Sequence, residues 1–232
     1  MRRTLPIALI AAVVASIAPA SANTAARASN QPWPRAGTLV VGSVAARVAP
    51  DPHARVAHVF RQFRSDYRPQ EILAVRETVG ADGRVWDKLS LPMRPNGRYG
   101  WVPADTISVT PRVTRIVVRR GERRLRVYRG SRVMFSTPVA VGSKGRETPL
   151  GSFYVTARFV PDDSFLGTFA FETSAYSKMT DWPGGGVVGI HGTSQPWLLG
   201  RAVSHGCVRV SNAAAEELSH LVPLGTPISI VR

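Results

Sequence analysis

The sequence predicts a mainly β protein made of two consecutive β units, with one helix near the C-terminus. Short β-branched or apolar runs recur along most of the chain, and turn signals such as Asp82-Gly83 and Pro95-Asn96-Gly97 separate several of them. Only residues 213–221 combine apolar side chains at helical spacing with helix start and stop signals. An apolar content of 44% is ample for buried cores.

The first 22 residues have the order of a cleavable secretion signal. Arg2 and Arg3 precede an apolar stretch over residues 5–18, and Ala20-Ser21-Ala22 supplies the small residues of a cleavage site. The stretch is shorter than the roughly 20 residues of a spanning helix, which favours cleavage over a membrane anchor. We therefore expect an exported protein in the cell wall or periplasm. Residues 23–36, rich in Ala, Ser and Pro, are expected to form a flexible leader.

Residues 37–111 are predicted to form a small antiparallel β unit, with strands over 38–44, 72–79, 85–89 and 99–103. The segment that contains Leu91-Pro92, Pro95-Asn96-Gly97 and Gly100-Trp101-Val102 resembles the second half of a bacterial SH3-like barrel. Trp86 and Trp101 are expected in the core of this unit.

Residues 112–232 form the second predicted unit, after a junction at Thr110-Pro111-Arg112. Strands are expected over 115–118, 125–128, 133–141, 152–159, 169–173 and 187–191. Asn212 is predicted to cap a helix over 213–221, which Pro223 and Gly225 end before a last strand over 228–231.

The formal net charge of +15 requires an anionic environment or partner. Nucleic acid is not expected, because the predicted export argues against it and the dispersed arginines form no nucleic-acid-binding motif. An anionic cell-envelope polymer or membrane surface fits better. A merely solvated basic surface remains an equal alternative.

Cys207 is the single cysteine of the chain. A free thiol, with a pKa of about 8.5, becomes a nucleophile when an imidazole takes its proton. His191, at the end of a predicted strand, and His205 are both candidates for this base. The N–H groups of Gly206 and Cys207 are suited to hold an oxyanion, and Arg209 is suited to bind a substrate carboxylate. These residues predict acyl transfer through a thioester.

The thiol has two alternative interpretations. A buried cysteine is often only a small hydrophobic residue. His191, His205 and Cys207 are possible zinc ligands, but no fourth ligand has a convincing spacing. A zinc site is therefore not expected.

Three segments resemble a known family. Ile190-His191-Gly192-Thr193, Ser204-His205-Gly206-Cys207-Val208-Arg209 and the upstream Thr148-Pro149-Leu150-Gly151-Ser152-Phe153 are similar to the signature of the L,D-transpeptidases, the YkuD-type catalytic domain. The resemblance covers about residues 114–232. It implies a β-sandwich domain in which Cys207 is the nucleophile, His191 the general base and acid, and the Gly192 carbonyl the group that orients the imidazole.

The resemblance also implies roles for neighbouring residues. Ser204, His205 and Gly206 would shape the loop and oxyanion hole, and Arg209 and Thr193 would contact substrate. Trp197, in the loop between His191 and Ser204, is a further candidate substrate contact, with ordinary packing as an equal alternative. The Gly184-Gly185-Gly186 segment is a candidate flap. The oligomeric state is not predicted.

The implied activity is peptidoglycan cross-linking. Cys207 would attack the third residue of a tetrapeptide stem and release the terminal D-alanine, and an amine of a neighbouring stem would resolve the thioester into a 3→3 bond. The implied reaction needs no metal or organic cofactor. Acylation by carbapenems is implied as well. Two alternatives stay open: a cell-wall cysteine hydrolase, in which water resolves the thioester, and a non-catalytic wall-binding protein.

Overall fold

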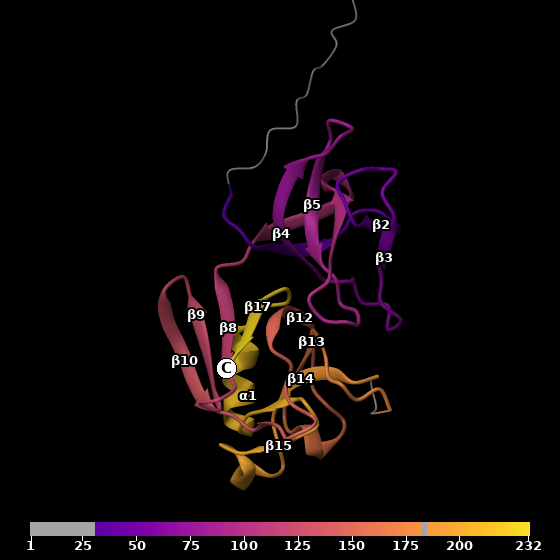
Figure 1. Ribbon diagram of the computed structural model, residues 1–232. Coiled ribbons are helices and arrows are strands. Elements are labelled where there is room, and N and C mark those ends of the chain that lie inside the picture. Colours follow the sequence, from indigo (N-terminus) through magenta and orange to yellow (C-terminus); the bar gives the residue numbers. More distant parts are fainter. Residues whose placement is uncertain (1–30, 182–184) are drawn as a thin grey trace, which may run out of the picture.

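The computed structural model describes residues 31–181 and 185–232, which form two β units joined end to end (Figure 1). The predicted signal peptide, most of the predicted leader and Gly184 of the candidate flap lie outside the described residues. Among the described residues, no helix has the length and apolar character needed to cross a membrane.

The first unit is a seven-stranded antiparallel sheet with the order β3-β2-β6-β5-β4-β1-β7. Its strands are β1 (Arg35–Leu39), β2 (Ser43–Arg47), β3 (Val56–Arg61), β4 (Ile72–Val79), β5 (Val85–Ser90), β6 (Tyr99–Pro103) and β7 (Ile107–Pro111), with the short 3₁₀ turn η1 (Ala104–Thr106) before β7. Trp86 and Trp101 are buried. The resemblance to an SH3-like barrel stays a prediction.

Two expectations about the start of this unit are corrected. The strand expected over 38–44 is two strands, because the chain turns between Leu39 and Ser43. The leader expected to reach residue 36 ends earlier, since β1 begins at Arg35. Ala36 is fully buried there, and Arg35 forms an ion pair with Glu77 at 3.0 Å. Burial and pairing of these residues hold the segment in the sheet.

The second unit contains an eight-stranded sheet with the order β10-β9-β8-β17-β12-β13-β14-β16. The pairs β8–β17 and β14–β16 are parallel and the other pairs are antiparallel. The strands are β8 (Thr114–Arg119), β9 (Arg124–Arg129), β10 (Arg132–Pro138), β12 (Gly151–Phe159), β13 (Ala170–Tyr176), β14 (Val187–His191), β16 (Val208–Arg209) and β17 (Pro227–Val231). A separate parallel pair joins β11 (Val141–Gly142) to β15 (Ala202–Ser204). The 3₁₀ turns are η2 (Ser164–Leu166) and η3 (Pro196–Leu198).

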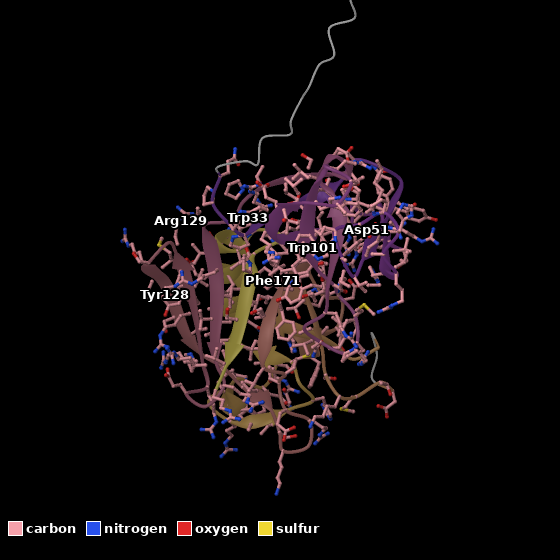
Figure 2. All side chains as sticks on the ribbon, turned by 45° about the horizontal axis from the view of Figure 1, so that its top comes forward. Trp33, Asp51, Trp101, Tyr128, Arg129 and Phe171 are labelled. Carbon is pink, nitrogen blue, oxygen red and sulfur yellow. The ribbon has the colours of Figure 1, made fainter. Side chains whose placement is uncertain are left out.

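The helix α1 (Asn212–Leu221) lies beside the strands of the second unit and buries Ala214, Ala215 and Leu218 in its core (Figure 1). Phe171 of β13 belongs to the same core, in the interior of the unit (Figure 2). The predicted cap is wrong: Ser211 caps the helix, and its Oγ accepts a hydrogen bond from Ala214 N–H at 3.1 Å. Asn212 starts the helix, which leaves its side chain for another contact.

Loops of the first unit contact β13 of the second unit and the residues that directly follow it. The Asn96 side chain pairs with the backbone of Tyr176, through bonds of 2.8 and 3.0 Å. Arg94 donates to the carbonyl oxygens of Ser177 and Met179 at 3.0 and 2.9 Å. Arg64, in the loop after β3, forms an ion pair with Glu172 of β13. These contacts position the first unit against the β13 region of the second (Figure 1).

Candidate active site

The parallel pairing of β14 with β16 brings the two sequence motifs together. Ile190 pairs with Val208 and His191 with Arg209, so that Cys207, just before β16, lies beside the end of β14. A cavity of about 300 Å³ opens here. Its lining includes predicted site residues from both motifs: His191, Ser204, His205, Cys207 and Arg209.

The Cys207 thiol is held by the backbone of β14. Its Sγ accepts a hydrogen bond from Gly189 N–H at 3.3 Å. Burial raises the pKa of the thiol, against the lowering effects of this bond and of the Arg209 charge. The thiol is therefore protonated at neutral pH and needs a base.

Gly189 keeps a space open between the thiol and the imidazole. A Cβ at this position would lie 3.9 Å from Cys207 Sγ and 3.6 Å from His191 Cδ2. Both groups therefore contact the same small volume. A larger side chain would fill that volume.

His191 is buried and oriented by its own turn. Its Nδ1 lies 2.6 Å from the carbonyl oxygen of Gly192, which only accepts hydrogen bonds, so Nδ1 carries the proton. Burial, with a smaller contribution from the Arg209 charge, lowers the pKa of His191 to about 4, against the raising effect of the backbone groups of Gly192 and Leu166. The neutral ring thus has an unprotonated Nε2, the form required of a general base.

Asn212 fixes the turn that carries the Gly192 carbonyl. Its Oδ1 accepts a hydrogen bond from Thr193 N–H at 2.9 Å. It also lies 2.4 Å from the position that a Cβ on Gly192 would take, so only glycine fits there without displacement. The sequence suggested a helix cap at Asn212 and gave no sign of this contact.

The loop before Cys207 is closed by Ser204. Its Oγ donates to the Cys207 carbonyl oxygen at 2.6 Å and accepts from Gly206 N–H at 3.1 Å. The expectation that Gly206 N–H faces an oxyanion is therefore wrong, because Ser204 already occupies it. Within the described part of the chain, Cys207 N–H takes no part in these bonds, and its role as an oxyanion donor stays a prediction.

Arg209 places a buried guanidinium at the cavity. It lies 4.6 Å from the centre of the Phe165 ring and donates to Gln195 Oε1 at 3.3 Å. Its buried Nε has no hydrogen-bond partner among the described residues. An anionic ligand would satisfy this donor.

Two predicted substrate contacts do not reach the cavity. Thr193 is 2% exposed, and its Oγ1 accepts from Gln195 N–H, so it shapes the turn. Trp197, on η3, is 70% exposed and is not among the residues that line the cavity. Neither residue is part of the cavity wall.

The cavity also contains residues that the sequence did not single out. Phe165 and Leu166 come from η2, Asp163 precedes it, and Glu172 lies on β13. Only strand pairing and the path of the η2 loop reveal them. No group of three metal-ligating side chains occurs within residues 31–181 and 185–232.

Comparison with known proteins identifies the family. The model of the L,D-transpeptidase catalytic domain, YkuD, matches residues 113–230. A Bacillus licheniformis protein named as the L,D-transpeptidase YkuD is 34% identical over 170 residues, covering 70% of this chain and 95% of that protein. Its Bacillus subtilis namesake is 31% identical over 162 residues, covering 67% and 92%.

An L,D-transpeptidase structure from Mycobacterium smegmatis is 16% identical, covers 64% of this chain and 90% of its own, and gives a TM-score of 0.44. The match to the family model, together with 34% identity along nearly all of the Bacillus licheniformis protein, shows that this chain belongs to the L,D-transpeptidase family.

Proposed function

We propose that the protein is an exported peptidoglycan L,D-transpeptidase that forms 3→3 cross-links through a thioester on Cys207. One observation carries the proposal: the only thiol of the chain shares a cavity with a neutral histidine whose Nδ1 is held by a carbonyl. Membership of the family supports the reaction class.

In the acylation step, Sγ attacks the carbonyl carbon of the third stem residue while His191 Nε2 takes the thiol proton. Cys207 N–H donates to the oxyanion that develops. Gly189 N–H stabilises the sulfur as it gains charge. His191 then gives the proton to the nitrogen of the terminal D-alanine, the peptide bond breaks, and the stem stays on sulfur as a thioester.

In the second step, the side-chain amine of a diamino acid on another stem attacks the thioester. His191 takes a proton from the attacking nitrogen and returns it to sulfur as the C–S bond breaks. The product is a 3→3 amide and a free thiol. If water attacks instead, the same site acts as a carboxypeptidase and yields a shortened stem.

Arg209 supplies positive charge for the donor. A tetrapeptide stem ends in a carboxylate next to the bond that breaks, and the Arg209 side chain lines the cavity. The side chain orients this end of the stem through a charge-assisted hydrogen bond.

The proposed location and further partners of the protein rest on two features of the sequence. Residues 1–22 direct export, which brings the enzyme to its polymer. The net charge of +15 favours association with anionic polymers of the cell envelope.

The test is incubation of the protein without residues 1–22 with a disaccharide tetrapeptide. Cross-linked dimer and an equal amount of free D-alanine are expected, with neither formed by Cys207→Ala. Shortened monomer alone would assign the hydrolase instead. An envelope function that survives Cys207→Ala would assign the wall-binding alternative.

A further inference from the structure

One acidic residue of the cavity wall lies on β13, the strand next to β14. Glu172 of β13 pairs directly with Gly189 of β14, the residue whose N–H holds Cys207 Sγ. Directly opposed residues point to the same side of an antiparallel pair, so the Glu172 side chain shares the cavity side with the thiol. Its side chain is 35% exposed and lines the cavity.

The partner of Glu172 comes from the first β unit. Arg64, three residues after β3, places Nη2 at 2.6 Å from Glu172 Oε2. The same loop is anchored nearby by Arg68, which donates to the Arg158 carbonyl oxygen at 3.2 Å. The first unit thus contributes a cation to a carboxylate of the candidate active site.

Arg64 has a second carboxylate within reach. Its Nε lies 3.3 Å from Asp66 Oδ2, in the same loop. Asp66 Oδ2 also accepts from Arg68 Nη2 at 2.6 Å, so this carboxylate lies between two guanidinium groups. An Arg64 side chain displaced from Glu172 keeps Asp66 as a neighbour of opposite charge.

The other acidic residue of the cavity is already committed. Asp163 caps η2, and its Oδ1 accepts from Phe165 N–H at 2.8 Å. Glu172 is therefore the carboxylate that a cationic ligand would meet.

We propose that Glu172 binds the side-chain ammonium of the stem's diamino acid, and that Arg64 of the first unit occupies this carboxylate when the cavity is empty. The assignment rests on the proposed function, which brings such an ammonium to the thiol. The ammonium belongs either to the donor stem or to the acceptor stem. An acceptor ammonium first loses one proton to solvent, and neutral His191 then takes the second proton as the amine attacks.

The test compares Glu172→Gln with Arg64→Gln in three reactions: acylation by a carbapenem without an ammonium group, D-alanine release from the tetrapeptide donor, and resolution of the thioester by increasing acceptor amine. Glu172→Gln should slow donor acylation or weaken acceptor use about tenfold, since a charge-assisted contact is lost. Its carbapenem acylation should stay within about twofold of wild type. Arg64→Gln should shift the same step in the opposite direction, because the competing cation is gone.

The reactions also identify the source of the ammonium. An effect confined to D-alanine release assigns the donor, and one confined to resolution assigns the acceptor. Acetylation of the relevant side-chain amine should then erase the difference between wild type and Glu172→Gln. Because an acetylated acceptor cannot attack the thioester, it is tested as a competitor for binding.

Three results would overturn the assignment: neither substitution alters any step, both shift a step in the same direction, or carbapenem acylation falls together with the stem reactions. Each would make the ion pair purely structural. A wild-type protein that neither carbapenem nor stem acylates contradicts the proposed function itself, and the assignment falls with it.

Discussion

At the scale of single residues, burial acts on Cys207 and His191 in opposite directions, because it penalises the charged form of each. The thiol pKa rises and the imidazole pKa falls to about 4. At neutral pH the pair is thiol and imidazole, and the proton moves only when a substrate carbonyl is attacked. The reaction starts from uncharged groups.

This protonation state predicts the acid limb of the pH profile. His191 stays neutral until the pH falls toward about 4, so carbapenem acylation should persist through the range where an ordinary histidine becomes protonated. The measurement is the second-order acylation rate across this acidic range. A loss of rate centred at about pH 6.5, the usual pKa of histidine, would contradict the assignment of His191 as a buried base.

Gly189 gives a second prediction at this scale. The Cβ of an alanine would lie at ordinary contact distance from the thiol and imidazole. Its distance of 3.3 Å from the Phe171 carbonyl oxygen would be tight. Valine would push methyl groups into the shared space. Gly189→Val should lower acylation about a hundredfold, and Gly189→Ala far less, because the reacting groups are separated. Acylation rates of folded variants, checked by circular dichroism, decide this. Equal rates would contradict it.

At the scale of elements, two adjacent polar residues at the start of α1 have separate tasks. Ser211 caps the helix, whereas Asn212 ties it to the turn after β14. Asn212→Ala should slow acylation about tenfold, because the Gly192 carbonyl that orients His191 is released. Ser211→Ala is the matched control: it should cost about 1 kcal/mol of stability and leave acylation within about twofold. Unfolding curves and acylation rates measure both. The same catalytic loss in both variants would make the Asn212 contact merely a stabiliser of the helix.

The elements also show what sequence patterns can predict. The runs over 72–79, 99–103 and 187–191 coincide with β4, β6 and β14, because each is a clear apolar or β-branched run that ends at a turn or breaker. The edge strand β3 was missed, since its exposed side chains give no buried period. The two-residue β16 is too short for any periodic signal, although its pairing builds the site.

The sequence predicts site residues only where the residue type itself indicates the chemistry. Cys207, His191 and Arg209 were found from the thiol, the base and the cation that acyl transfer needs, and the structure brings all three to one cavity. The contacts of Glu172 and Asn212 depend on strand register and on a turn closing against a helix. Trp197 was expected at the cleft from its position between the two motifs, and that position alone does not determine which residues line the cavity.

At the scale of the whole molecule, a buried carboxyl lies where the two units meet. Glu71 is 3.5 Å from Arg112, and its backbone carbonyl accepts from the Tyr154 hydroxyl of the second unit. Burial raises the pKa of Glu71 to about 7, against the lowering effect of Arg112. The folded protein therefore keeps a proton that the unfolded chain loses at about pH 4.3.

This shift predicts a pH-dependent stability. Between the unfolded and folded pKa values the folded state binds more protons, so this carboxyl lowers stability as pH rises toward about 7. Glu71→Gln should raise the Tm by a few degrees at pH 8 and have little effect at pH 4.5. Thermal unfolding at the two pH values measures the difference. A variant that loses the same stability at both would show that Arg112 needs the charged carboxylate.

The central claim is that Cys207 accepts an acyl group. Intact-mass measurement after mixing with a carbapenem tests it most directly, with Cys207→Ala as the control. Wild-type protein should gain the mass of one carbapenem, located at Cys207 by peptide mapping, and the alanine variant should gain none. Unmodified wild-type protein, or an adduct that persists in Cys207→Ala, would contradict the account.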